Sequence, residues 1–472
     1  METLSYFPDA TGTEEETRIS IWQPSRDNVP ATFVNFDGKQ CSILNHGIDK
    51  FCPTLPSSSE FRENGSRTYV DAGGVELASP EVDNPVDQLI YTKATARLLE
   101  ESLANYMSTE SRSRDRELVG VFQRRVIDDK GNTWGCHDNF SIQQPGYVKL
   151  VPNEGAEIGR LWVGYLYSRG IISGAMHVGE RGSTFSQKLS RDHSFDKYGY
   201  GNSLLRVDDA HGQRLEVRCN DVNLLDWAFL SRIGGTSLLL AASQTALGSK
   251  LVGSKLFQFD ERERASWNTV PLDRNYDLYA AKGLKRAIDM QRYVFSTILE
   301  NLESYTNEAT PKIYRKIGKG ILQFCDDLEA VANGKSDLDI LTDRADWAAK
   351  LKIIREHIRR KPSKRRLGDA KSRMTDLMYD RISVRAQPDS EAITSYGYGH
   401  VLAADKSILR RYPNTIEVAM HCPPQRTRAS VRVRAAKRLG DKVTGCDWHA
   451  ITVNGSEEPI PLGGLRKATV QV

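Results

Sequence analysis

The stretch that most limits what this chain can fold into runs from Glu63 to Glu81, ENGSRTYVDAGGVELASPE. It gathers polar groups without needing any long-range contact. Alternation after its Asn-Gly turn predicts a β-strand, in which Arg67, Tyr69 and Asp71 project from one face. The sequence therefore predicts a strand that presents a guanidinium group, a phenol and a carboxylate on one face.

Two glycines follow this strand and allow a sharp turn into a second short run, Val75 to Ala78, which presents Glu76. The stretch thus offers two carboxylates and a phenol to one small region. A solvated hairpin edge with charged outer positions is the alternative, and these residues alone do not separate the two interpretations.

A second acidic strand is predicted near the N-terminus. The segment GTEEETRISI, Gly12 to Ile21, alternates so that Glu14, Glu16 and Arg18 share a face. Like charges two residues apart repel unless something neutralises them. Either this strand is a solvated edge, or a hard divalent cation binds between Glu14, Glu16 and Glu76.

Composition describes an ordinary globular protein, with 39% hydrophobic and 27% charged residues among 472. We expect one large domain and a smaller one. No apolar run approaches the roughly 20 residues of a membrane helix, and Met1 to Asp9 lacks the features of a secretory signal. A cytoplasmic location is expected. The net charge of +4 is too small to indicate nucleic acid.

Strand patterns come early in the chain and helical patterns later, which is typical of the α+β class. Asn84-Pro85 predicts a helix start, with the helix ending near Met107. Further helical patterns lie at Asp221–Leu247, interrupted at Gly234-Gly235, and from Tyr279 to about Ile382. Additional strands are expected within Leu118–Ile127, Leu161–Val178 and Arg214–Asn220.

Two of these regions carry further candidate site residues. A glycine turn at Gly135 is followed by His137 and Asp138, which suits a site loop, although a hydrogen-bonded structural histidine is the alternative. Alternation in the strand predicted from Arg214 places Glu216 away from the core, as another acidic position.

Basic residues gather in two places. Six Lys or Arg lie between Arg359 and Arg366, as a solvated helix end or as a surface for an acidic partner or nucleic acid. In the final segment, for which we expect strand and turn structure, Arg428 and Arg432 have a spacing that suits phosphate or carboxylate contacts on a strand, or an exposed basic strand. Trp448 is a core or stacking residue.

Taken in order, these motifs resemble the Pup ligase and Pup deamidase/depupylase family, relatives of glutamine synthetase and the carboxylate-amine ligases. The resemblance covers essentially the whole chain. Each motif is weak alone, but the combination is specific. The matching pieces are GTEEETRISI, NGSRTYVDAGGVELASPE, GNTWGCHDNF, RLEVRCNDVNL, DWAAKLKII, DLMYDRI and PPQRTRASVR with Asp447-Trp448.

The resemblance implies a glutamine synthetase-like catalytic domain over residues 1–400, with a curved antiparallel β-sheet packed with helices, and a small C-terminal domain over 401–472. It implies Pup and pupylated proteins as partners, with no nucleic acid and no membrane. Pup is a small disordered acidic modifier, joined through its C-terminal glutamate to lysines of target proteins.

Carried over residue by residue, the resemblance makes Asp71 the catalytic aspartate. It implies Mg²⁺ and ATP, ADP or phosphate as candidate cofactors. The implied positions are Glu14, Glu16, Tyr69, Glu76 and Glu216 for metal, Arg428, Arg432 and Trp448 for the nucleotide, and Arg67, His137 and Asp138 elsewhere in the site.

Departures from the family pattern decide between its two activities. Glu216 replaces the family's histidine, and Arg124 to Asp128 replace Lys-Asn-Asn-Thr-Asp, both on the nucleotide side. Ligation needs ATP in register, whereas isopeptide cleavage does not. We therefore expect a depupylase that hydrolyses the isopeptide bond between Pup and lysine, with an altered nucleotide site. The alternatives are an ATP-dependent Pup–protein ligase, which the short stretch from Ile21 to Asn64 favours, and a catalytically silent Pup-binding relative.

Overall fold

The computed structural model divides the chain into two compact units. The first contains residues 1–8, 126–379 and 398–408, and the second contains 9–125, 380–397 and 409–472. Within these ranges the structure describes residues 6–23, 32–34, 52–53, 59–71, 74–114, 117–124, 126, 135–142, 157–178, 184–186, 205–208, 214–259, 266–267, 269–273, 276–307, 309–360, 366–385, 413–456 and 458–462. The separate small domain expected over 401–472 remains a prediction.

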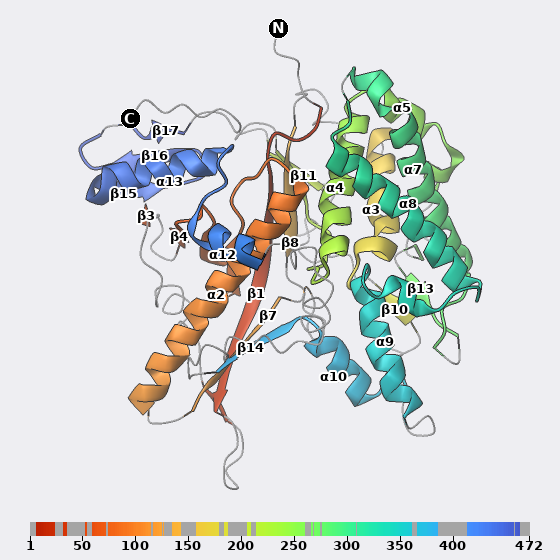
Figure 1. The fold of residues 1–472 in the computed structure, drawn as a ribbon, viewed down its shortest axis with the longest axis horizontal. Helices are drawn as coiled ribbons and strands as arrows, with labels where there is room; N and C mark the ends of the chain where they lie inside the picture. Colours follow the sequence, from red (N-terminus) through yellow and green to blue (C-terminus); the bar gives the residue numbers. More distant parts are fainter. Residues whose placement is uncertain are drawn as a thin grey trace. The chain divides into compact units, whose positions relative to one another are not determined.

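The second unit is built on the long strand β1 (Figure 1). All its described strand pairs are antiparallel. β1 pairs with β2, β6 and β7, β7 pairs with β14, and β6 continues through β5 and β4 to β3. The bounds are β1 Thr11–Gln23, β2 Thr32–Val34, β3 Cys52–Pro53, β4 Ser59–Phe61, β5 Arg67–Asp71, β6 Gly74–Ala78, β7 Val119–Gln123 and β14 Arg381–Arg385.

Helix α2 (Pro85–Arg114) packs on this sheet. It begins where expected, because the Asn84 side chain accepts hydrogen bonds from the backbone N–H groups of Val86 and Asp87 at 3.1 and 2.9 Å. Its apolar face forms a core with β1, β6 and β7 that includes Leu103. The helix therefore covers one face of these three strands with its apolar side chains.

The second unit also contains a small three-stranded sheet and two helices near the C-terminus. Helix α12 (Pro413–His421) lies against α2, and α13 (Arg428–Leu439) is followed by strands β15 to β17. The strand bounds are β15 Val443–Cys446, β16 Ala450–Val453 and β17 Ile460–Pro461. The strand expected at Arg428 is thus wrong. Val431, Ala435 and Ala436 lie at helical spacing and are buried, so packing selects a helix over the alternating Arg-Val pattern.

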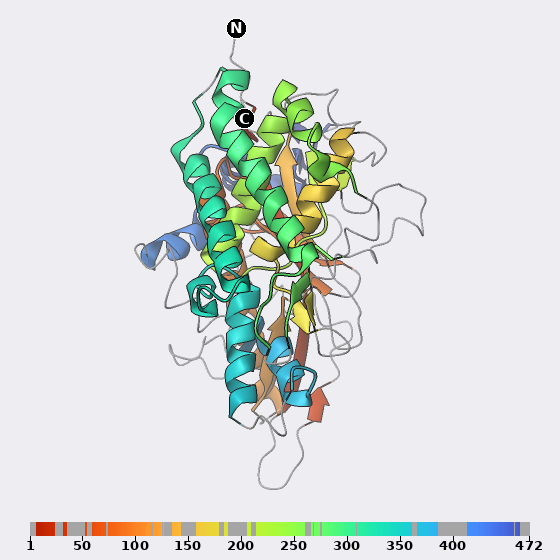
Figure 2. The ribbon, with the colours of Figure 1, turned by 90° about the vertical axis from the view of Figure 1, so that its right-hand side faces the viewer.

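The first unit contains a run of three paired strands, a three-stranded sheet and a set of helices, of which α7 and α8 lie side by side (Figure 1, Figure 2). The strands pair as β11-β12-β8 and β13-β10-β9. Strand bounds are β8 Cys136–Ser141, β9 His177–Val178, β10 Thr184–Ser186, β11 Leu205–Asp208, β12 Arg214–Val217 and β13 Thr269–Pro271. Helix bounds are α3 Glu157–Ser173, α4 Asp226–Ser243, α5 Ala246–Val252, α7 Lys282–Thr306, α8 Lys312–Ala332, α9 Asp346–Arg359 and α10 Ala370–Met378.

Two expectations for this unit need correction. The strand expected within Leu161–Val178 is only the two-residue β9, and most of that stretch is helix α3. Nearly all side chains of α3 are buried, so its hydrophobic residues show no helical periodicity. The break predicted at Gly234-Gly235 is absent, because α4 runs straight through it. A Cβ on Gly234 would meet Ile317 Cδ1 at 2.4 Å, so this glycine allows close packing of α4 on α8.

The expected α+β class is confirmed, with antiparallel sheets and a helical region after Tyr279. Among the described helices, none combines the length and apolar character that a membrane crossing requires. The cytoplasmic location stays a prediction. Of the basic run between Arg359 and Arg366, residues 361–365 lie outside the described residues. Arg359 is the last residue of α9, and Arg360 and Arg366 lie between α9 and α10.

Candidate active site

Three neighbouring strands of the second unit bring most of the predicted metal-site residues onto one face. Glu16 of β1 pairs with Glu76 of β6, and Glu76 pairs with Tyr69 of β5. Glu14 and Arg67 both pair with Ala78 and so lie one step along on the same face. Directly paired side chains on adjacent strands lie within contact distance, so the register alone assembles this group.

The charges of this face are concentrated. A carboxylate oxygen of Glu14 lies within 4.8 Å of one from Glu76. Glu16 and Glu76 are both buried, at 8% and 4% exposure. Burial and the charges of Glu14 and Glu76 raise the pKa of Tyr69 well above its usual range, so its phenol stays protonated and donates to Glu76.

This donor set fits a magnesium ion. Mg²⁺ prefers oxygen ligands and is often bound through one or two carboxylates together with substrate phosphates. Glu14, Glu16 and Glu76 offer carboxylate oxygens, with the Tyr69 hydroxyl beside them. A divalent cation would reduce the mutual repulsion of these three carboxylates. Their assignment as ligands remains a prediction.

The predicted catalytic aspartate, Asp71, is the last residue of β5 and pairs with Gly74. Its side chain lies outside the described part of the chain. A Cβ on Gly74 would come within 2.8 Å of the Thr17 carbonyl oxygen, so the close strand approach at this point requires glycine. The backbone thus places Asp71 at the end of the row that contains Tyr69.

Two arginines flank the acidic face. Arg67 has its guanidinium carbon 4.9 Å from the Tyr69 ring centre and 5.6 Å from that of Phe61. Arg18, which the sequence placed on the face of Glu14 and Glu16 without a role, has a guanidinium nitrogen 3.4 Å from the position of a Cβ on Gly74. Arg18 is the site candidate that sequence reasoning missed, and its alternation with the two glutamates was the available signal.

The first unit contains three further predicted site residues, Glu216, His137 and Asp138. Glu216 of β12 pairs with Asn139 of β8, and its Oε1 lies 3.4 Å from His137 Nδ1. Asp138 points to the other face, where its carboxylate lies 3.0 Å from the Arg232 guanidinium and both side chains are fully buried. The expected loop here is strand β8. Asp138 therefore has a structural ion pair, and the metal role of Glu216 remains a prediction.

The predicted nucleotide residues lie together in the second unit, where Arg428 and Arg432 contact Glu81 and Trp448 contacts Arg432. Glu81 lies 2.5 Å from Arg432 and 3.2 Å from Arg428. The guanidinium carbon of Arg432 lies 4.3 Å from the ring centre of Phe61 and 4.9 Å from that of Trp448. Their nucleotide role remains a prediction, since both guanidinium groups form ion pairs with the Glu81 carboxylate.

Electrostatics explains why this cluster stays ionised. Burial alone would raise the pKa of Glu81, but Arg432 and Arg428 outweigh burial and hold that pKa below its usual range. Arg432 also donates to the carbonyl oxygens of Gly65 and Trp448, each at 3.3 Å. The cluster therefore holds the turn before β5 against α13 and the small sheet.

Arg124, which differs from the family pattern and was interpreted as a lost nucleotide contact, has a structural partner in this fold. Arg124 donates two hydrogen bonds to Glu15 Oε2, at 2.9 and 2.6 Å, and both side chains are buried. Glu15 lies on the face of β1 opposite to Glu14 and Glu16. Of the other changed positions, Val126 is a buried core residue, while residues 125, 127 and 128 lie outside the described residues. These changes are thus no evidence that nucleotide binding is lost.

Comparison with known proteins identifies the family. A family model described as Pup-ligase protein matches residues 10–198 and 205–452. The Pup–protein ligase of Bifidobacterium dentium is 27% identical over 423 residues, covering 84% of this chain and 80% of that protein. The Pup–protein ligase of Mycolicibacterium smegmatis is 26% identical over 424 residues, covering 84% and 85%.

Two solved structures share the fold. The chain matches the ligase in the complex between Pup and its ligase PafA with a TM-score of 0.72, at 21% identity, over 99% of this chain and 90% of that one. It matches the Pup ligase PafA in complex with ADP with a TM-score of 0.63, at 22% identity, over 94% of each chain. The predicted glutamine synthetase-like fold class is confirmed, and the expected partner and nucleotide are those bound in these related structures.

The expected depupylase activity is wrong. The curated relatives described above are named as Pup–protein ligases, and both related structures are of a Pup ligase. These findings favour the ligase alternative. The prediction failed because it treated changes such as Arg124 as lost nucleotide contacts, whereas Arg124 has a buried partner in Glu15. The chain belongs to the Pup-ligase protein family.

Proposed function

We propose that this chain is an ATP-dependent carboxylate-amine ligase that joins the C-terminal glutamate of Pup to lysine side chains of target proteins. The observation that carries the proposal is the row formed by Glu16, Glu76 and Tyr69 across three strands, with Glu14 beside it and Asp71 at the strand end. The ligase names of the relatives support the same reaction.

The first step transfers phosphate. The side-chain carboxylate of Pup's C-terminal glutamate attacks the γ-phosphorus of ATP, a bond to the bridging oxygen breaks, and an acyl phosphate and ADP form. Mg²⁺ bound by the carboxylates of Glu14, Glu16 and Glu76 would neutralise phosphate charge in this step. The guanidinium groups of Arg67 and Arg18 suit the orientation of phosphate or carboxylate oxygens.

The second step forms the isopeptide bond. A target lysine must lose a proton before its amine can attack the acyl phosphate, and inorganic phosphate then leaves. Asp71 is the proposed base that accepts this proton. The pairing of Asp71 with Gly74 fixes the backbone from which that carboxylate extends.

Transfer of purified Pup to a lysine-bearing target, with ADP measured in parallel, tests the proposal. We expect one ADP per isopeptide bond formed in the wild type, and in Asp71→Asn we expect no isopeptide bond and no ADP beyond a single turnover. Asp441→Asn, which makes the same change at an exposed position of the same unit, is the control and should keep wild-type activity. Pup binding without ADP formation would overturn the ligase assignment in favour of a silent binding protein. Full activity in Asp71→Asn would overturn the role of Asp71.

A further inference from the structure

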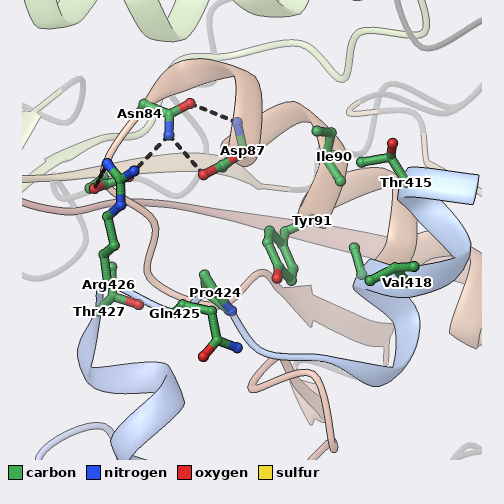
Figure 3. A pocket seen from close by; sticks show the side chains of 12 residues that line it. Asn84, Asp87, Ile90, Tyr91, Thr415, Val418, Pro424, Gln425, Arg426 and Thr427 are labelled. Atoms are coloured by element: carbon green, nitrogen blue, oxygen red, sulfur yellow. Dashed lines mark hydrogen bonds and ion pairs between the residues drawn. The ribbon is translucent and has the colours of Figure 1, made fainter. Parts of the chain in front are cut away.

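A pocket of about 470 Å³ lies within the second unit, and none of the residues assigned to ligation lines it (Figure 3). Three short segments line it: the start of α2, helix α12, and the connection from α12 to α13. Its lining residues are Asp83, Asn84, Asp87, Ile90, Tyr91, Thr415, Val418, Ala419, Pro424, Gln425, Arg426 and Thr427. Nothing in the proposed reaction uses them.

One end of the pocket is acidic. The Asn84 side-chain amide donates to Asp83 Oδ1 at 3.0 Å and to Asp87 Oδ2 at 2.7 Å, which fixes both carboxylates at the pocket (Figure 3). A neutral amide orients these two groups without cancelling their charge. Burial, opposed by the hydrogen bond from Asn84 and reinforced by the charge of Asp83, raises the pKa of Asp87 above its ordinary value. A cation at this end would therefore be stabilised.

The rest of the lining is largely apolar. Val418 is 57% exposed although it is a large hydrophobic residue, and Ile90, Ala419 and Pro424 lie around the same pocket. The hydroxyl of Tyr91 donates to the Cys422 carbonyl oxygen at 2.9 Å, which fixes the ring at the pocket. An aliphatic stem would contact these groups, and an aromatic face also attracts a cation.

One cationic side chain of the protein, that of Arg426, already contacts a carboxylate of this pocket. Arg426 has a guanidinium nitrogen 3.6 Å from Asp83 Oδ2, yet its side chain is 83% exposed. Such an exposed ion pair contributes little to stability, so an incoming cation can displace it. Arg426 is the one cationic side chain among the lining residues, against the two carboxylates.

We propose that this pocket binds a lysine or arginine side chain presented by a protein partner. The aliphatic stem lies along Tyr91 and Val418, and the cationic head contacts Asp83 and Asp87. Charge complementarity selects this occupant, because a carboxylate would be repelled and a purely apolar side chain would gain no electrostatic contact with Asp83 or Asp87. The inference goes beyond the ligase activity and does not depend on it.

The proposal is tested by measuring the binding of three capped amino acids to the full chain. Saturation-transfer NMR, without ATP or Pup, detects the binding. The probes are the N-acetyl methylamides of lysine, norleucine and glutamate. We expect the lysine probe to bind, the norleucine probe to bind at least about fivefold more weakly, and the glutamate probe not to bind. Equal binding of lysine and norleucine would overturn the proposal, and so would no binding of lysine.

Substitutions then locate the site. Asp83→Asn and Asp87→Asn should each weaken lysine binding about two- to fivefold, whereas Arg426→Gln should strengthen it about twofold by removing the competing cation. The matched control is Asp441→Asn, an exposed carboxylate outside the pocket, which should change nothing. Equal weakening in Asp441→Asn, or no gain in Arg426→Gln, would refute a specific pocket. Ligase activity, measured separately, reports on the proposed function.

Discussion

Glu16 of β1 and Glu76 of β6 lie directly opposite each other in an antiparallel pair, and both side chains are buried. Like charges in this position destabilise a sheet unless something neutralises them. A third carboxylate, Glu14, lies close to that of Glu76. The same carboxylates that would bind a metal ion therefore lower the stability of the metal-free protein. This link can be tested without an activity assay.

We expect Glu76→Gln to raise the melting temperature by about 2–4 °C in the absence of divalent ions, since about 1 kcal/mol of repulsion is relieved. Magnesium should stabilise the wild type and leave Glu76→Gln unchanged. Thermal unfolding with and without Mg²⁺ measures both effects. The exposed Glu458→Gln serves as control, and an equal magnesium response in Glu76→Gln would contradict metal binding at this face.

Gly74→Ala should destabilise the protein by about 1–3 kcal/mol, because the new Cβ would lie 2.8 Å from the Thr17 carbonyl oxygen. Ligase activity should fall further than stability alone explains, since Asp71 pairs with this residue. Gly12→Ala, in β1, meets nothing within 4 Å and is the matched control. Melting temperature and Pup transfer are the measurements, and equal behaviour of both variants would remove the steric argument.

The Glu81 cluster predicts an acid-sensitive contribution to stability. Because the folded pKa of Glu81 lies below its ordinary value of 4.5, its stabilisation is full above that pH and is lost as pH falls through the folded pKa. Glu81→Gln should thus be less stable than wild type at pH 7, with the difference shrinking below about pH 4. Denaturant titrations at both pH values check this; a gap that does not depend on pH would contradict it.

Breaking the same cluster from the other side should cost more. Arg432→Met removes the partner closest to Glu81 and leaves its buried carboxylate with Arg428 alone, which should destabilise by about 3–5 kcal/mol. Urea unfolding measures the loss. The exposed Arg438→Met is the control, and similar stability of the two variants would show that the Arg432 pair contributes little.

Glu100 on α2 predicts the opposite pH trend. Burial is the main cause that raises its pKa to about 7, although Arg97 opposes the shift. For a raised carboxyl pKa, the folded state loses stability as pH rises from about 4.5 to 7. Glu100→Gln should therefore equal wild type near pH 4 and exceed it at pH 8 by about 1–3 kcal/mol. Melting temperatures at both pH values decide, and a variant that is less stable at pH 8 would refute the shift.

The strand face of the candidate site was predictable because its logic is local. Side chains alternate along any strand, so the sequence placed Glu14 with Glu16, and Arg67 with Tyr69 and Asp71, and the structure has β1 and β5 at those positions. The start of α2 was equally local, since Asn84 caps its own helix. The cross-strand register that sets Glu16 against Glu76 required the fold.

Tertiary structure alone decided the rest. Alternating arginine and valine around Arg432 fit a strand as well as a helix, and burial against Phe61 and the small sheet selected the helix. The partner of Arg124 is more than a hundred residues away, at Glu15, so its substitution could be mistaken for lost nucleotide chemistry. By itself the sequence determined which groups share a strand face, because that depends on backbone geometry between near neighbours. Which groups neutralise one another depends on contacts between distant segments, and only the folded chain supplies those.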